Sequence, residues 1–115
     1  MSINDWKNDK CVKNWFELLG NQRTIENYSH DFPNFLAYVY ENTPYKSPTE
    51  IIQSRIENLT SQDMVKRRFW EQTVVKYKNS LEQKNLRMAT VHGKLRTVMS
   101  FFSKNGVKLL FSRGE

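Results

Sequence analysis

The chain is poor in the residue types that build disulfides and metal sites. Cys11 is its only cysteine, so no disulfide can form within its 115 residues. His30 and His92 are its only histidines, and no spacing among these three residues matches a structural zinc site. A single thiol is typical of proteins in a reducing compartment. We therefore expect a cytoplasmic protein that binds no metal.

Long apolar runs and nucleotide-binding loops are also missing. No apolar stretch approaches the roughly 18 residues that a membrane-spanning helix requires, so we expect no membrane partner. With only 4 glycines, the chain has no glycine-rich phosphate loop, and it contains no Gly-x-Ser-x-Gly nucleophile motif. Acidic residues are scattered singly over polar helix faces. We expect neither a catalytic centre nor a cofactor in this chain.

Apolar residues at helical spacing are what the sequence does contain. Val12, Trp15, Phe16 and Leu19 recur at i, i+3, i+4 and i+7, which places them on one face of a helix. Similar stripes predict helices at about 7–19, from about 23, after the Ser47-Pro48 cap, at about 62–83 and from 87. No segment alternates apolar and polar residues far enough to predict a strand. The expected fold class is all-α, a compact bundle of four to five helices forming one domain, globular over about 10–110.

The net charge of +6 is concentrated at one end of the sequence. Residues 1–83 carry eleven basic and eleven acidic side chains, whereas residues 84–115 carry seven basic residues and one acidic residue. A basic patch confined to one end favours a polyanion as partner. The alternative is that these cations only form a solvated surface.

The segment RMATVHGKLRTVMSFF has two contrasting faces when it is drawn as a helix. Its apolar residues project to one side and should face the core. Thr90, Gly93 and Thr97 cluster on the opposite side, flanked by Lys94 and Arg96. A glycine in a helix costs roughly 1 kcal/mol relative to alanine, so its presence needs a reason. A small, positively flanked face of this kind suits a DNA groove, although a helix surface that merely tolerates glycine is the alternative.

Two patterns in the sequence are similar to those of one protein family. The same segment resembles small-x-Thr-Ile-x-x-x-Leu-x-x-Leu-x-x-Phe-Phe at Thr90, Val91, Leu95, Val98, Phe101 and Phe102. Upstream, RTIENYSHDFPNFLAYV resembles Thr-x-x-x-Tyr-x-x-x-Leu-x-x-Phe at Thr24, Tyr28 and Phe35, with Phe32 in place of leucine. In this order they resemble the first and last long helices of the SAM-like, N-terminal core-binding domain of tyrosine recombinases and phage integrases. The resemblance covers about residues 10–110.

This resemblance implies that the chain is one domain of a larger, two-domain recombinase. In such recombinases the core-binding domain and a larger catalytic domain close as a clamp around double-stranded DNA during integration or recombination. The implied partners are therefore duplex DNA, a catalytic domain of the same full-length protein and other recombinase protomers on DNA, at the nucleoid. No residue here matches the family's catalytic set, so this chain is expected to be the non-catalytic half. Residues 111–115 are then expected to begin a linker to an absent catalytic domain.

The expected DNA face joins the start of the second helix to the start of the last one. Helix N-termini offer free N–H groups and the positive end of the helix dipole to phosphates. The predicted DNA-binding residues are Gln22, Arg23, Thr24, Lys84, Arg87, Thr90, Gly93, Lys94, Arg96 and Thr97. Two alternatives stay open. One is a helical protein-interaction module, and the other is a helix-turn-helix transcriptional regulator that uses 62–83 and 87–105 as its helix pair.

Overall fold

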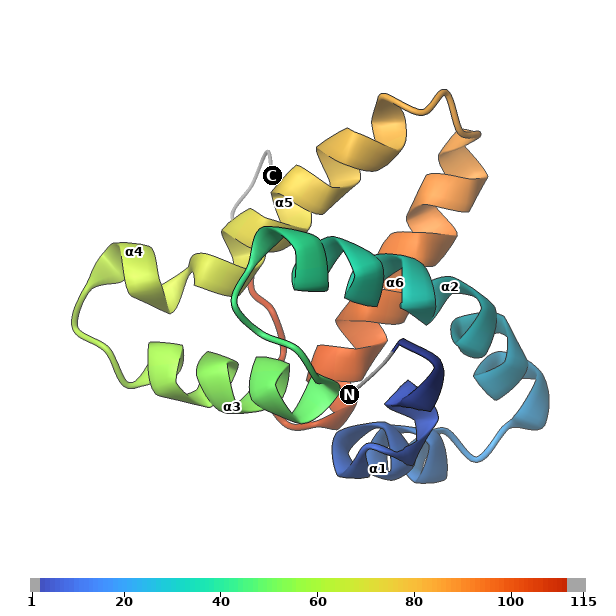
Figure 1. Ribbon diagram of the computed structural model, residues 1–115, viewed down its shortest axis with the longest axis horizontal. Coiled ribbons are helices and arrows are strands. Elements are labelled where there is room, and N and C mark those ends of the chain that lie inside the picture. Colours follow the sequence, from blue (N-terminus) through green and yellow to red (C-terminus); the bar gives the residue numbers. More distant parts are fainter. Residues whose placement is uncertain (1–2, 112–115) are drawn as a thin grey trace.

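Helices dominate the computed structural model, which describes residues 3–111 (Figure 1). Within those residues, a 3₁₀ helix, η1 (Ile3–Asn8), precedes six α-helices, and no strand is present. The α-helices are α1 (Lys10–Leu19), α2 (Gln22–Asn42), α3 (Pro48–Leu59), α4 (Met64–Arg67), α5 (Phe69–Glu82) and α6 (Met88–Lys104). The predicted all-α bundle is confirmed.

Helix α6 lies at the centre of the bundle because α1, α2 and α5 all pack against it. Figure 1 shows α2 crossing α6, while α3 and α4 extend to the opposite side of the molecule. Six fully buried aromatic side chains lie in the core among buried valine, leucine and isoleucine residues: Trp15, Phe32, Phe35, Trp70, Phe101 and Phe102. The indole N–H of Trp15 donates to Ser100 Oγ at 2.9 Å, so its one polar atom is satisfied.

Local sequence signals set most helix ends. Gly20 ends α1 in the left-handed conformation, with a φ of 65°, which a residue without Cβ adopts at little cost. The side chain of Asn21 accepts from the amide of Thr24 and begins α2. At α3, the Ser47 side chain accepts from the amide of Glu50, and Pro48 occupies the first turn, as the sequence predicts.

The long helix expected at 62–83 is interrupted, and this raises the helix count above the predicted four to five. Helix α4 ends at Arg67 and α5 begins at Phe69, with Arg68 between them at φ −105° and ψ 14°. Arg55 of α3 explains the interruption, because its Nη1 donates to the carbonyl of Arg67 at 3.3 Å. A continuous helix would pair that carbonyl with the amide of Glu71.

A buried ion pair holds α3, α5 and the C-terminal segment together. Arg55 and Glu71 are only 1% and 3% exposed, and they form two parallel hydrogen bonds of 2.8 and 2.9 Å. Arg55 also donates to the carbonyls of Val107 and Lys108, while Glu71 accepts from the amide of Leu110. The expectation that acidic residues occupy only solvated faces is therefore wrong at Glu71. The spacing of residues along the helix does not distinguish Glu71 from an exposed glutamate.

Candidate nucleic-acid interface

The crossing of α2 over α6 forms a polar groove of about 390 Å³. Helix α2 contributes the first part of its lining, including Thr24, His30 and Asp31. Helix α6 contributes Gly93, Arg96 and Thr97 to the facing wall. Two sequence motifs separated by about seventy residues thus meet in one place, and four of the predicted DNA-binding residues lie in it.

Gly93 of α6 faces Asp31 of α2 across the groove. A Cβ built on Gly93 would come 3.9 Å from Asp31 Oδ2, which is ordinary van der Waals contact. A larger side chain would project toward Asp31 and fill the groove. The small residue at this position therefore leaves room between the two helices, and that room is the groove itself.

Thr97 does not belong to an exposed face. It is 1% exposed, and its hydroxyl donates to the carbonyl of Gly93 at 3.0 Å, one turn back along the same helix. The expectation that Thr97 faces outward, opposite the core, is wrong. Helix α2 covers the side of α6 that a single-helix projection leaves open, so Thr97 packs beneath the groove instead of offering its hydroxyl to a ligand.

Lys94 makes its contacts within the protein. Its Nζ lies 3.2 Å from Asp31 Oδ1 and 2.8 Å from Asn34 Oδ1, both on α2. The pair is 13% and 22% exposed, so water screens it only partly. Lys94 thus neutralises the one carboxylate in the groove lining, which would otherwise repel an anionic ligand.

Arg96 is the exposed cation of the groove. It lies on α6 opposite the first turns of α2, where Thr24 is half-buried and Gln22 and Arg23 are exposed. Gln22 bonds weakly to Glu26 of its own helix, at 3.4 Å. Thr24 and Arg96 can therefore present one hydroxyl and one guanidinium group to a ligand in the groove, and Arg23 is exposed at the adjacent start of α2.

Lys84, Arg87 and Thr90 form a second cluster, at the turn between α5 and α6. All three are exposed, and the turn passes through Asn85 at a positive φ of 58°. Thr90 and Thr97 are seven residues apart, or about 10 Å along a helix. The start of α2 thus packs beside the middle of α6 rather than beside its start, and the continuous face expected to join the two helix starts is wrong in this respect (Figure 1).

A second groove, also of about 390 Å³, lies next to the turn between α5 and α6, and Glu41 adds a carboxylate to its lining. Lys84 and Lys94 both contribute to its lining, between α2 and α5. Tyr77 lies in the same lining, and burial, reinforced by the carboxylate of Asp31, raises the pKa of its hydroxyl well above the usual value. The hydroxyl therefore stays protonated, and it can only act as a neutral group beside the two ammonium groups.

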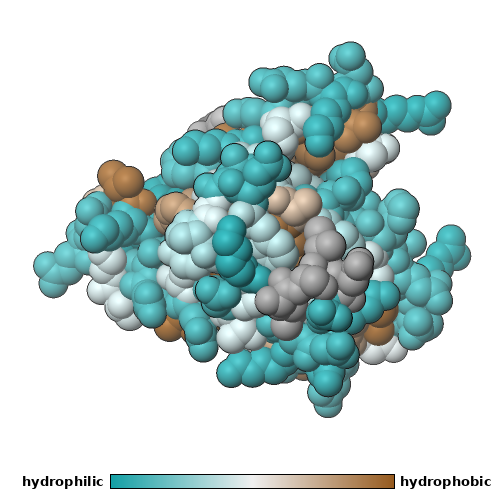
Figure 2. Space-filling view, viewed as in Figure 1, coloured by the Kyte–Doolittle hydropathy of each residue, from teal (hydrophilic) through white to brown (hydrophobic). Residues whose placement is uncertain are grey.

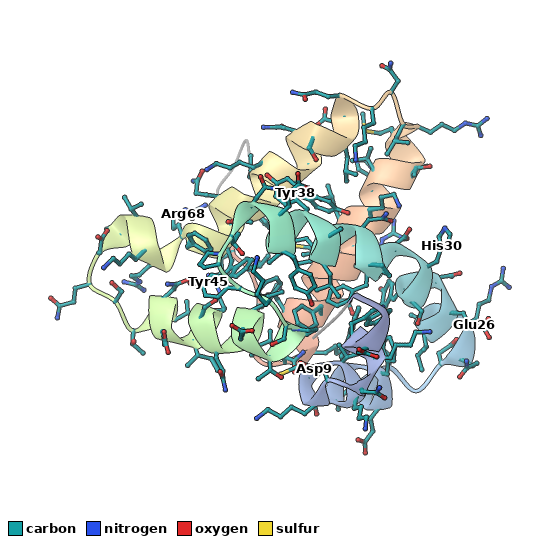
Figure 3. All side chains as sticks on the ribbon, viewed as in Figure 1. Asp9, Glu26, His30, Tyr38, Tyr45 and Arg68 are labelled. Atoms are coloured by element: carbon teal, nitrogen blue, oxygen red, sulfur yellow. The ribbon has the colours of Figure 1, made fainter. Side chains whose placement is uncertain are left out.

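Sequence inspection missed several residues of the groove. Asn27, His30 and Asp31 line it from α2, and Asn34 supports Lys94. Figure 3 shows His30 on the first half of α2, on the outer side of the molecule, far from Arg68 along the long axis. These residues lie on the polar face of an amphipathic helix, and nothing local distinguishes a polar residue that faces α6 from one that faces solvent.

None of the family models, curated proteins or solved structures compared with the chain matches it. Over residues 3–111, no three histidine, cysteine or carboxylate side chains come together as metal ligands would. In the same part of the chain, no helix combines the length and the apolar character needed to cross a membrane.

Proposed function

We propose that this chain binds double-stranded DNA, as the core-binding half of a tyrosine recombinase or integrase. The observation that supports this most is the groove between α2 and α6. It brings Thr24 from one family-like motif together with Gly93 and Arg96 from the other. Arg96 is an exposed cation of this groove, Arg23 is exposed at the start of α2, and Lys84 and Arg87 are exposed separately, at the turn between α5 and α6.

Phosphates are the part of DNA that this surface suits best. Arginine forms two parallel hydrogen bonds with a phosphate, and a helix N-terminus adds backbone donors. Thr97, which would have offered a hydroxyl to base edges, is buried. The proposed contacts therefore position the duplex by its backbone and shape, and they carry little direct sequence information.

The packing of α6 makes the helix-turn-helix alternative less suitable. In a helix-turn-helix protein the recognition helix lies in the major groove, and its N-terminal residues contact the base edges. Helix α6 packs against α1, α2 and α5, and among its side chains Val91, Thr97 and Val98 are buried. Its exposed residues are Met88, Ala89, Thr90 and His92 near its start, Arg96 in its middle, and Ser103 and Lys104 at its end. Such a helix can touch a duplex with its N-terminal end but cannot enter the groove lengthwise.

Duplex titration at two salt concentrations tests the proposal. We expect binding of a fluorescein-labelled 30-base-pair duplex to weaken steeply when salt is raised, because each phosphate contact releases a counterion. Arg96→Gln should weaken binding to all duplexes alike and lower the salt slope by about one unit. Lys66→Gln is the matched control, since Lys66 is exposed on α4 at the other side of the molecule.

Comparison with the control variant shows which results would contradict the proposal. Equal loss from Arg96→Gln and Lys66→Gln would show that only net charge matters, and no duplex binding at low salt would remove the proposal altogether. Tight binding of a dimer to one sequence would favour a helix-turn-helix regulator instead. In the proposed assembly, cutting and rejoining of strands belongs to a separate catalytic domain.

A further inference from the structure

The corner formed by α3, α4 and α5 exposes apolar side chains that the proposed DNA surface does not use. Met64 and Val65 are 67% and 79% exposed, although both types usually occur inside proteins. Figure 2 shows brown, hydrophobic atoms at the α4 end of the molecule, next to teal ones. Single exposed apolar residues need no explanation, but adjacent ones beside a groove do.

A groove of about 500 Å³ lies beside these two residues. Its lining consists of three apolar residues, Met64, Val65 and Phe69, and four polar or charged ones, and the apolar side chains provide most of its exposed area. The polar and charged lining residues are Arg68, Gln72, Thr73 and Lys76. The volume of the groove lies in the range of about 300–1,000 Å³ that is typical of binding pockets. The methionine side chain is flexible and polarisable, which suits an adaptable contact surface.

The shape of this groove follows from the buried ion pair described above. Arg55 donates a hydrogen bond to the carbonyl of Arg67, and the helix is interrupted at Arg68. Helix α4 therefore turns away from the axis of α5. Arg68 in turn donates to the carbonyl of Leu110 at 3.4 Å. The buried Arg55–Glu71 pair thus holds α4 in this position, although burying two charges is energetically costly. Figure 3 shows Arg68 at the junction of the two helices.

The charges around the groove indicate the chemistry of its occupant. Lys66 and Arg67 are exposed on α4, and Lys76 contributes to the groove lining. The two carboxylates of the segment 63–76 already have partners in the protein, since Asp63 caps the amides of Val65 and Lys66, and Glu71 pairs with Arg55. An apolar groove with a cationic rim is complementary to an amphipathic segment with acidic flanks.

We propose that this α4 groove, lined by Met64, Val65, Phe69, Thr73 and Lys76, docks an acidic amphipathic segment of a partner protein. A second copy of this chain is a poorer occupant, because two cationic rims would face each other at a net charge of +6 per chain. A membrane surface is flat and does not fill a groove. DNA would leave Met64 and Val65 without apolar partners.

Selection from a random 16-residue peptide display library tests this directly. The full chain serves as bait, and the double variant Met64→Ser/Val65→Ser serves as counter-selection. Both residues are exposed, so the double variant should fold and melt like the parent. We expect the enriched peptides to be acidic and to carry apolar residues at helical spacing. Enrichment of neutral or basic peptides, or no enrichment, would overturn the proposal.

One enriched peptide, synthesised and labelled, then provides the quantitative test. We expect at least tenfold weaker binding to Met64→Ser/Val65→Ser and to Lys66→Gln/Arg67→Gln. The controls are Leu18→Ser and Lys13→Gln, which alter an exposed apolar residue and an exposed cation of α1 and should change affinity less than twofold. Equal losses in the controls would contradict a site on α4.

Two further probes separate this site from other surfaces. We expect the chain loaded with unlabelled duplex to bind the peptide as before, and Met64→Ser/Val65→Ser to bind duplex like the parent. Competition between peptide and duplex would show that the groove belongs to a DNA surface and would overturn the proposal. Binding to vesicles containing phosphatidylserine that depends on Met64 and Val65, without peptide binding, would assign the corner to membranes instead.

Discussion

Each of the two surfaces is organised around one ion pair, and the pairs differ in how deeply they are buried. Arg55 and Glu71, below the α4 groove, are 1% and 3% exposed and bond to four backbone groups besides each other. Lys94 and Asp31, in the α2–α6 groove, are 13% and 22% exposed and have Asn34 as a third member.

This difference separates a structural role from an adjustable one. A buried charge pair costs several kcal/mol of desolvation per ion, and removing one partner leaves the other charge without compensation. The Lys94–Asp31 pair is partly screened by water, so its loss should cost far less than that of the buried pair, about 1 kcal/mol, and should leave the fold intact. The first pair therefore determines where α4 lies, whereas the second sets the charge of a surface that already exists.

The largest effect is expected from Glu71→Gln. The guanidinium of Arg55 would remain buried without a counter-charge, so we expect a loss of about 3–5 kcal/mol in the free energy of unfolding, measured by urea denaturation. The double variant Arg55→Met/Glu71→Met removes both charges but leaves four backbone groups without these partners, so it should recover only part of this loss. If Glu71→Gln alone cost less than about 1 kcal/mol, the pair would not be the buried clamp described here.

Thr97→Lys tests the burial of the α6 face. The new ammonium group would have to displace α2 or stay in the core beneath the groove, so we expect destabilisation of about 1–3 kcal/mol or more. The control is Thr90→Lys, which makes the same substitution at an exposed position of the same helix. It should change the free energy of unfolding very little. An unchanged melting temperature for Thr97→Lys would restore the outward orientation that the sequence pattern predicts.

Gly93→Ala should stabilise the protein slightly. The added Cβ makes ordinary contact with Asp31, and alanine favours the helix by about 1 kcal/mol, so the melting temperature should rise. Gly93→Gln would gain helix propensity too, but its side chain should occupy the groove and weaken duplex binding. Undiminished duplex affinity of Gly93→Gln, measured by anisotropy at two salt concentrations, would mean that the groove is not a DNA surface.

The smallest effect on stability is expected from Asp31→Asn. The amide keeps the shape of the side chain, and the lost ion pair costs at most about 1 kcal/mol. Removing the carboxylate leaves Lys94 as a net positive charge in the groove, so duplex affinity should rise several-fold at low salt and less at high salt. Weaker duplex binding by Asp31→Asn would contradict a phosphate contact at this groove.

Short-range patterns predicted a large part of the fold. The stop at Gly20, the Ser47-Pro48 start of α3 and the stop at Asn105-Gly106 all lie where the sequence places them. Each depends on residues within about four positions of one another. The same holds for the buried stripe of α6, where Val91, Val98, Phe101 and Phe102 are all in the core.

The candidate site was only partly predictable. Thr24, Gly93 and Arg96 share one groove in the middle of α6, whereas we expected the start of α2 to lie beside the start of α6; Thr97 is buried and Lys94 is paired. The error at Thr97 has a physical cause. A projection of one helix shows which side is least apolar, and it cannot show that a second helix with small and polar residues of its own packs against that side.

By itself, the sequence determined the all-α class, most helix ends and the apolar stripes, because capping bonds and helical periodicity act over a single turn of chain. The tertiary structure alone decided which polar faces are covered, where α4 turns away from α5, and which charges are buried. Arg55 meets Glu71 and the carbonyls of Val107 and Lys108 only because three separate segments converge. Such convergence depends on how helices cross, and that is set by the packing of the whole core.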